Sequence, residues 1–220
     1  MASSADFRPR GVRRVSEEGG CGVIGCATSE PIAGRHLILP LAQMNNRGNG
    51  KGGGIAAAGC FESLKDAYAL HIGYLDTGVR SALEEEFVRP HFEVLHEEDQ
   101  PELADHREVE GLEIRPPAVR RYFVRLREDR LRDFMLDAGI KDPIAAEQRF
   151  IYENSVAINR RFYVDNPRAF VLSHAKNLMV LKGVAYAEQV AKFYKLDDFK
   201  ANIWIGHQRY PTRGRVWHPG

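Results

Sequence analysis

The chain has 220 residues, of which 44% are hydrophobic, so it is long enough to bury the core of one sizeable domain. Its 31 Lys and Arg residues nearly balance its 30 Asp and Glu residues, and the formal net charge of +1 gives no global attraction to nucleic acid or anionic lipid. Three cysteines exclude a disulfide-stapled scaffold and favour a reducing compartment. No apolar run reaches the roughly 18 residues of a membrane span, and the N-terminus lacks the apolar core of a secretory signal. We therefore expect a soluble, cytoplasmic protein.

Residues 1–20 and the segment after them differ sharply in character. The first twenty residues are rich in Ser, Gly, Arg and Glu and poor in apolar side chains, which predicts a leader. Cys21–Ala27 is small and apolar and predicts a buried strand. A helix is expected over Gly34–Met44, beginning or bending at Pro40.

The glycine-rich segment Gly48–Gly54 predicts a loop with positive-φ positions, because five of its seven residues are glycine. It lacks the Gly-Lys-Ser/Thr ending of a phosphate-binding loop, so that interpretation fails. A plain flexible turn and a loop beside an active site both remain open. Strands are expected at Ile55–Phe61 and Ala67–Tyr74.

The middle of the chain carries segments of opposite charge. Leu83–Glu113 contains 12 acidic residues and two arginines, which favours a solvated, partly helical insertion spanning about residues 80–150. A docking surface is the alternative for this segment. Val119–Leu126 alternates like a strand, and the arginines in and after it are expected on one exposed face.

The last third predicts short strands and helices. Ala169–Ser173 and Leu178–Leu181 are β-type runs separated by a short segment that contains Ala175-Lys176-Asn177, which predicts a hairpin. Because neighbouring runs favour antiparallel pairing, the expected fold class is α+β. The other elements expected after residue 127 are helices at Arg130–Ile140, from Asp142 onward and at Ala187–Leu196, an ambiguous segment at Ile151–Val164, and a strand at Asn202–Gln208.

Cys21 is the candidate nucleophile. It follows Gly19-Gly20, and cleavage of the Gly20–Cys21 bond would give it a free α-amine with a pKa of about 7.7–8.0. That amine can take the proton of the thiol, so that nucleophile and base belong to one residue. The alternative for Cys21 is that it is a small buried residue without a chemical role, which is the interpretation that we give to Cys26 and Cys60.

Two motifs carry a resemblance to a known family. Cys21–Gly25 reads Cys-Gly-Val-Ile-Gly, and Gly206–Thr212 reads Gly-His-Gln-Arg-Tyr-Pro-Thr. Together with the Asn46–Gly48 loop, they resemble the class II glutamine amidotransferases, whose glutaminase domains are N-terminal-nucleophile hydrolases. The Asn46–Ala56 and Val180–Val184 segments look most similar to the glutaminase subunit or domain of archaeal-type glutamate synthase. The resemblance covers about residues 20–59 and 169–220.

The resemblance implies a fold, a reaction and a partner. The fold would be an αββα sandwich of two stacked antiparallel sheets between helix layers, in a glutaminase domain spanning residues 21–220. The reaction would be hydrolysis of L-glutamine to glutamate and ammonia through a Cys21 thioester. Ammonia would pass to a synthase subunit that carries FMN and an iron–sulfur cluster, because three cysteines cannot supply a four-cysteine cluster in this chain. Another ammonia acceptor and a non-catalytic regulatory module are the alternatives.

The resemblance also implies site residues. Arg209 would bind the α-carboxylate of glutamine through its planar guanidinium, and Tyr210 and Thr212 would shape the pocket. Gly22 would leave room for the substrate. The alternatives are a structural ion pair for Arg209 and ordinary turn packing for Tyr210 and Thr212. His207 is expected to be a satisfied strand-end histidine, and Gln208 stands where the family usually has Thr, so we expect it to tune the site.

Two parts of the family pattern are missing. The family's Asn-Gly oxyanion pair and its acidic residue for the substrate amine lie C-terminal to the arginine strand. The resemblance therefore implies a domain that is incomplete at its C-terminus, although His218-Pro219 matches a short family His-Pro. Removing one oxyanion donor costs about 10²–10³ in turnover, and a lost strand exposes apolar surface. We expect the isolated 220-residue chain to be poorly active or unstable, and equal, robust glutaminase activity of this chain and a C-terminally extended form would contradict that expectation.

Overall fold

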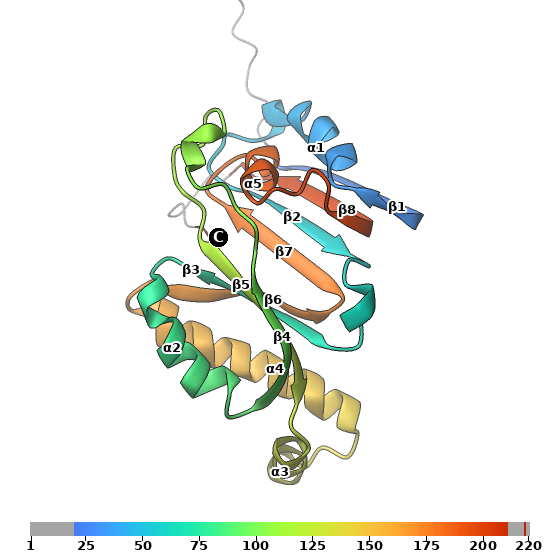
Figure 1. The fold of residues 1–220 in the computed structure, drawn as a ribbon, viewed down its shortest axis with the longest axis vertical. Coiled ribbons are helices and arrows are strands. Elements are labelled where there is room, and N and C mark those ends of the chain that lie inside the picture. Colours follow the sequence, from blue (N-terminus) through green and yellow to red (C-terminus); the bar gives the residue numbers. More distant parts are fainter. Residues whose placement is uncertain (1–19, 211–217, 219–220) are drawn as a thin grey trace, which may run out of the picture.

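The computed structural model describes residues 20–210 and residue 218. In this part the chain is α+β, with eight strands in two four-stranded antiparallel sheets and five α-helices (Figure 1). The strands are β1 Gly22–Ala33, β2 Gly53–Ala58, β3 Tyr68–Tyr74, β4 Phe92–Asp99, β5 Ala118–Leu126, β6 Ala169–Lys176, β7 Leu178–Gly183 and β8 Lys200–Gln208. The helices are α1 Arg35–Ala42, α2 Arg80–Leu83, α3 Glu128–Ala138, α4 Pro143–Asn159 and α5 Ala187–Phe193.

Each sheet joins strands that are far apart in the sequence. The first sheet has the order β1-β8-β2-β7, and the second has the order β4-β5-β3-β6. The first and last described strands are neighbours, since β1 pairs with β8 in a register that sets Gly22 opposite Gln208. In Figure 1, α1 and α5 lie on the first sheet, and α2 and α4 lie against the second.

Two hydrophobic clusters hold these layers together. One joins α1 and α5 to the inner face of the first sheet and to one face of the second, and it includes Leu41, Ile55 and Phe123. The other packs α4 and the helical turn at Glu84–Val88 against the opposite face of the second sheet, around Tyr122. The second sheet is therefore covered on both faces.

A close approach between α1 and β8 fixes the helix on the first sheet. Leu41 is fully buried, and a Cβ on Gly206 would lie 2.5 Å from its Cδ2. Only glycine at 206 lets Leu41 pack against the strand at this distance. The helix begins five residues before Pro40 and includes it, so the proline neither starts nor ends the helix.

Most elements expected from the sequence are present. The predicted strands before residue 75 correspond to β1, β2 and β3, and the predicted Ala187–Leu196 helix corresponds to α5. Gly139 ends α3 in a left-handed conformation with φ 66°, and the Asp142 side chain accepts a hydrogen bond from the Ile144 N–H at the start of α4. The ambiguous segment after Ile151 is helical.

The hairpin expected at residues 169–181 is wrong. β6 pairs with β3 in the second sheet, whereas β7 pairs with β2 in the first. Asn177 makes the turn between them with φ 51°, and its side chain accepts hydrogen bonds from the backbone N–H groups of Cys60 and Phe61. This turn therefore carries the chain from one sheet to the other.

Part of the acidic segment is a strand of the second sheet, and other parts of it form the expected helical turns, at Glu84–Val88 and His106–Glu108. Phe92–Asp99 forms β4, which pairs with the arginine-rich strand β5. Arg120 forms ion pairs with Glu97 and Asp99 across these strands. The acidic residues of β4 and the arginines of β5 thus neutralise one another across two neighbouring strands.

Arg121 is buried, contrary to the expectation of one exposed arginine face. It is 3% exposed, bonds to His71, Glu98 and Gln100, and lies 4.5 Å from the centre of the Phe61 ring. Burial and the Arg121 charge lower the pKa of His71 to about 3. His71 is therefore neutral and can accept the Arg121 hydrogen bond.

Two leucines of α1 test the packing of this helix. We expect Leu41→Ala to lower the free energy of unfolding by about 2–5 kcal/mol, because it leaves a cavity against β8. Leu39, which is 71% exposed on the same helix, is the control, and Leu39→Ala should change stability by less than about 0.5 kcal/mol. Urea unfolding measures both, and equal effects would contradict the packing described here.

Candidate functional site

The structure brings the two predicted motifs together at one end of the first sheet. The Tyr210 backbone N–H donates a hydrogen bond to the Cys21 Sγ, with the nitrogen and sulfur 3.4 Å apart. The thiol of Cys21 is exposed, so a ligand can reach it. Arg209 is the residue before Tyr210, so this contact brings it close to Cys21, although the two are 188 positions apart in the chain.

Gly22 lies against the segment that follows α1. A Cβ at Gly22 would be 2.8 Å from the Arg47 Cβ and 2.9 Å from the Met44 Cε. Because Gly22 has no side chain, Arg47 of the same chain occupies the space on this side of the strand. Gly20, with φ 146°, also approaches the Arg47 guanidinium, which places this cation beside the Cys21 backbone.

Arg209 lies over the glycine-rich loop. Its backbone N–H donates to the Gly52 carbonyl oxygen at 2.9 Å, and a Cβ at Gly52 would be 3.0 Å from the Arg209 Cδ. The Arg209 Nη1 is buried, and no residue in the described part of the chain bonds to it. The loop therefore lies beside the candidate site and positions Arg209.

A cavity of about 360 Å³ extends from Arg209 across the outer face of the first sheet. Its lining comes from β2, β7 and β8, and the register sets His207, Gly54 and Lys182 in one row across these strands. Small residues on β2 form its centre, and aliphatic side chains of β7 and β8 flank it. The lining residues are Gly53, Gly54, Ile55, Ala56, Val180, Lys182, Ile205, His207 and Arg209.

Lys182 was not assigned a role from the sequence. It is half-buried, and burial together with the Arg209 guanidinium lowers the pKa of its ammonium. The sequence hints at Lys182 only through its place in a strand that resembles the amidotransferase pattern. Lys182 reaches the cavity because its strand pairs with β2 in a register that sets it opposite Gly54, and sequence patterns do not give this register.

Gln208 lies on the buried side of β8, beneath the site. Its side-chain oxygen accepts from the Ala187 N–H at the start of α5, and its nitrogen donates to Asn45 and Glu188 at 2.8 and 2.7 Å. Asn45 donates to the other oxygen of the Glu188 carboxylate. Gln208 thus ties β8 to the ends of two helices and has no direct access to the cavity face.

The remaining predicted residues are placed as follows. Thr212 lies outside the described residues. Cys26 packs against the first hydrophobic cluster, and burial raises the pKa of the Cys60 thiol to about 12, so Cys60 stays protonated at neutral pH. His218 accepts a hydrogen bond from the Val184 N–H, and burial lowers its pKa.

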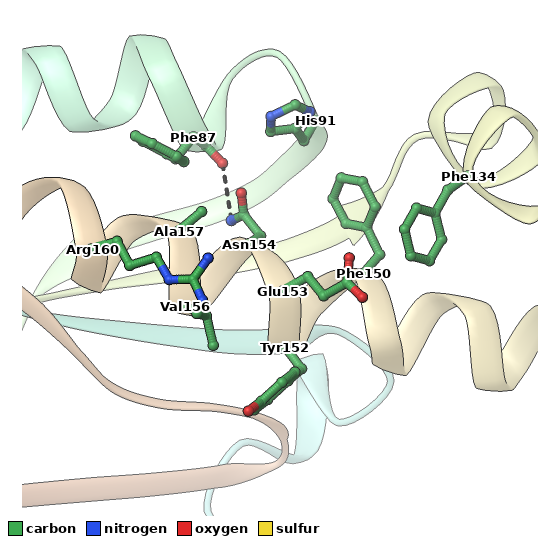
Figure 2. Close-up of a pocket in the computed structure, with 10 residues that line it drawn as sticks. All are labelled: Phe87, His91, Phe134, Phe150, Tyr152, Glu153, Asn154, Val156, Ala157 and Arg160. Carbon is green, nitrogen blue, oxygen red and sulfur yellow. Dashed lines mark hydrogen bonds between the residues drawn. The ribbon is translucent and has the colours of Figure 1, made fainter. Parts of the chain in front are cut away.

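A larger cavity of about 600 Å³ lies on the other side of the molecule (Figure 2). Figure 2 shows Phe134 and Phe150 next to each other at one end, where their rings pack edge to face, and the Asn154 amide bonded to the Phe87 carbonyl oxygen. Its described lining residues include no cysteine, serine or lysine. It therefore lacks a nucleophile of the kind that Cys21 provides.

Two further features of the described residues bear on function. Over residues 20–210 and 218, no group of three or more His, Cys, Asp or Glu side chains is placed to hold a metal ion. None of the helices in this same part has the length and apolar character needed to cross a membrane.

Comparison with known proteins gives one distant relative. No protein-family model matches the chain. An uncharacterized protein of Archaeoglobus fulgidus is 29% identical to it over 204 residues, which are 91% of this chain and 49% of that protein. The chain therefore spans about half the length of this relative.

The buried network under the site gives a stability prediction. Gln208→Met keeps the side-chain volume but removes the donors to Glu188 and Asn45, and we expect it to lower the free energy of unfolding by about 2–3 kcal/mol. Ile203→Met, at a 43% exposed position of the same strand, should change it by less than about 0.5 kcal/mol. If urea unfolding finds the two variants equally stable, Gln208 does not hold these helices to β8.

Proposed function

We propose that this chain is the glutaminase part of a class II glutamine amidotransferase, with Cys21 as its N-terminal nucleophile. The contact between the Cys21 Sγ and the Tyr210 N–H carries this proposal, because it joins the two resembling motifs at one exposed thiol. Arg209, the residue beside that contact, presents a buried and unbonded guanidinium nitrogen, as judged from the described residues.

The reaction begins once the Gly20–Cys21 bond is cleaved. The free α-amine of Cys21 takes the thiol proton, directly or through a water molecule, and the thiolate attacks the side-chain carbonyl carbon of glutamine. The C–N bond breaks, ammonia leaves with a proton from the α-ammonium, and a thioester remains. Water then hydrolyses the thioester, which releases glutamate and restores the thiol.

The neighbouring groups suit this chemistry. The Tyr210 N–H can stabilise negative charge on the Cys21 sulfur, since a charge-assisted hydrogen bond is stronger than a neutral one. Arg47 adds positive charge beside the Cys21 backbone. Arg209 can bind the α-carboxylate of glutamine in a bidentate manner, and Tyr210 shapes the pocket next to it. By the resemblance, Thr212 adds a further substrate contact, whereas the space expected for substrate at Gly22 is taken by Arg47 and Met44.

The proposal extends to the fold and the partner. The two antiparallel sheets and their helices support the N-terminal-nucleophile αββα sandwich as the fold. Ammonia from the reaction would pass to a glutamate synthase-type subunit, and that subunit would hold FMN and an iron–sulfur cluster. The reaction in this chain would proceed in the cytoplasm with L-glutamine as substrate.

The N-terminus and one substitution test the proposal. We expect mass spectrometry of the active protein to find a chain that starts at Cys21. Release of glutamate from L-glutamine should fall to background in Cys21→Ala and drop strongly in Cys21→Ser, because both remove the thiolate. Cys26→Ala, a change to a cysteine in the core, should retain the activity.

Two results would contradict the proposed chemistry. One is hydrolysis of glutamine by protein with an intact leader. The other is equal hydrolysis by Cys21→Ala and the unsubstituted chain.

A further inference from the structure

The cavity of about 600 Å³ along α4 has the size of a small-ligand site, since such sites measure about 300–1,000 Å³ (Figure 2). Phe134 lines it from α3, and Phe87 lines it from the helical turn at Glu84–Val88. Most of the remaining lining comes from α4, and His91 adds a ring just before β4 begins. The proposed glutaminase chemistry makes no use of this cavity, so its role is a separate question.

Aromatic rings surround one end of the cavity. The Phe134 and Phe150 rings pack edge to face with their centres 5.3 Å apart, and the His91 and Phe150 rings do so at 5.4 Å. Burial and the Arg130 charge lower the pKa of His91, so the imidazole is neutral at neutral pH. Three rings from three segments of the chain therefore present an uncharged aromatic surface, which suits a planar aromatic ligand.

A buried amide offers a hydrogen-bond acceptor to this cavity. Asn154 is 8% exposed, and its side-chain nitrogen donates to the Phe87 carbonyl oxygen at 3.2 Å. Because a carbonyl can only accept, this bond fixes which end of the amide is the oxygen. That oxygen has no hydrogen-bond partner in the part of the chain that the structure describes. In Figure 2 it points away from α4, between Phe87 and His91, so a ligand with an N–H group would satisfy it.

The two charged residues of the lining differ in how they are compensated. The Glu153 carboxylate forms an ion pair with Arg149 at 2.7 Å. Arg160 is exposed, and it has no ion-pair partner among the residues that the structure describes. Figure 2 shows the Arg160 side chain extended along α4 toward Asn154. The uncompensated guanidinium favours a ligand with an anionic group, because a charge-assisted hydrogen bond is stronger than a neutral one.

We propose that this cavity binds a nucleotide whose base carries an exocyclic amine, with AMP as the simplest example. The base lies among the rings of Phe134, Phe150 and His91, its amine donates to the Asn154 oxygen, and its phosphate pairs with Arg160. A purely apolar ligand would leave the amide oxygen and the guanidinium without partners. The described lining has no cysteine, serine or lysine, so the nucleotide is bound there and not transformed.

Titration calorimetry with three related ligands tests the contacts on the unsubstituted chain. We expect AMP to bind with a dissociation constant below about 1 mM. Purine riboside monophosphate lacks the exocyclic amine and should bind about fivefold more weakly, since one hydrogen bond to the Asn154 oxygen is lost. Adenosine lacks the phosphate and should also bind about fivefold more weakly, since an exposed ion pair is lost.

Substitutions locate the ligand in this cavity. Phe134→Ala should weaken AMP binding about tenfold, because the base loses one aromatic neighbour, whereas Leu136→Ala, at a 76% exposed position of the same helix, should not. Arg160→Gln should weaken AMP binding about fivefold and leave the affinity for adenosine unchanged. Arg132→Gln, at an exposed position of α3, should leave the affinity for both ligands unchanged.

Three results would overturn the nucleotide site. The first is the lack of saturable AMP binding at millimolar concentrations. The second is equal affinity for AMP and ribose phosphate, which would mean that the base is not recognised. The third is an AMP affinity that Arg160→Gln leaves unchanged, which would place the phosphate elsewhere, and this variant at an exposed position decides the matter if Phe134→Ala does not fold. AMP binding is measured without glutamine, so a failure of the proposed function does not affect it.

Discussion

Hydrogen bonds between β1 and β8 hold Cys21 against the segment that carries Arg209, and the candidate site depends on this pairing. The register sets Gly22 opposite Gln208, so a shift of one residue would turn the Arg209 side chain to the other face of the sheet. Glycine at 22 and at 206 lets the α1 helix and the turn after it pack closely on these strands. The same close packing that stabilises the sheet therefore determines where the thiol lies.

Buried polar groups fix the layers on either side of this sheet. Gln208 and Glu188 join β8 to α5 beneath the site, and Arg121 lies between the sheets with His71 and Glu98 as partners. Each group is satisfied by specific neighbours, and a buried polar group without its partner costs about 1–3 kcal/mol. Such networks restrict the sheets to one arrangement, and so they restrict the geometry at Cys21. The cavity beside Arg209 is a product of that arrangement.

Local patterns in the sequence predicted the elements near the site but not their partners. Alternation and small residues located β1 and β8, and the caps of α3 and α4 followed from Gly139 and Asp142. The turn at Asn177 looks the same whether its strands pair or enter different sheets, so the hairpin was wrong. The acidic strand β4 was missed because its charges are balanced across the sheet by β5, which is a long-range contact. The place of Lys182 at the cavity depends on strand register, and the sequence alone does not give it.

Covalent labelling with an electrophilic glutamine analogue shows whether Cys21 is the nucleophile that meets the side chain of glutamine. A diazoketone in place of the carboxamide of glutamine would alkylate a thiolate that lies where the amide carbon binds. We expect one adduct, which peptide mass spectrometry locates at Cys21. It should form more slowly in the presence of L-glutamine and at the normal rate in the presence of glutamine methyl ester. An adduct at Cys26 or Cys60, or labelling of Cys21 that L-glutamine does not slow, would contradict this expectation.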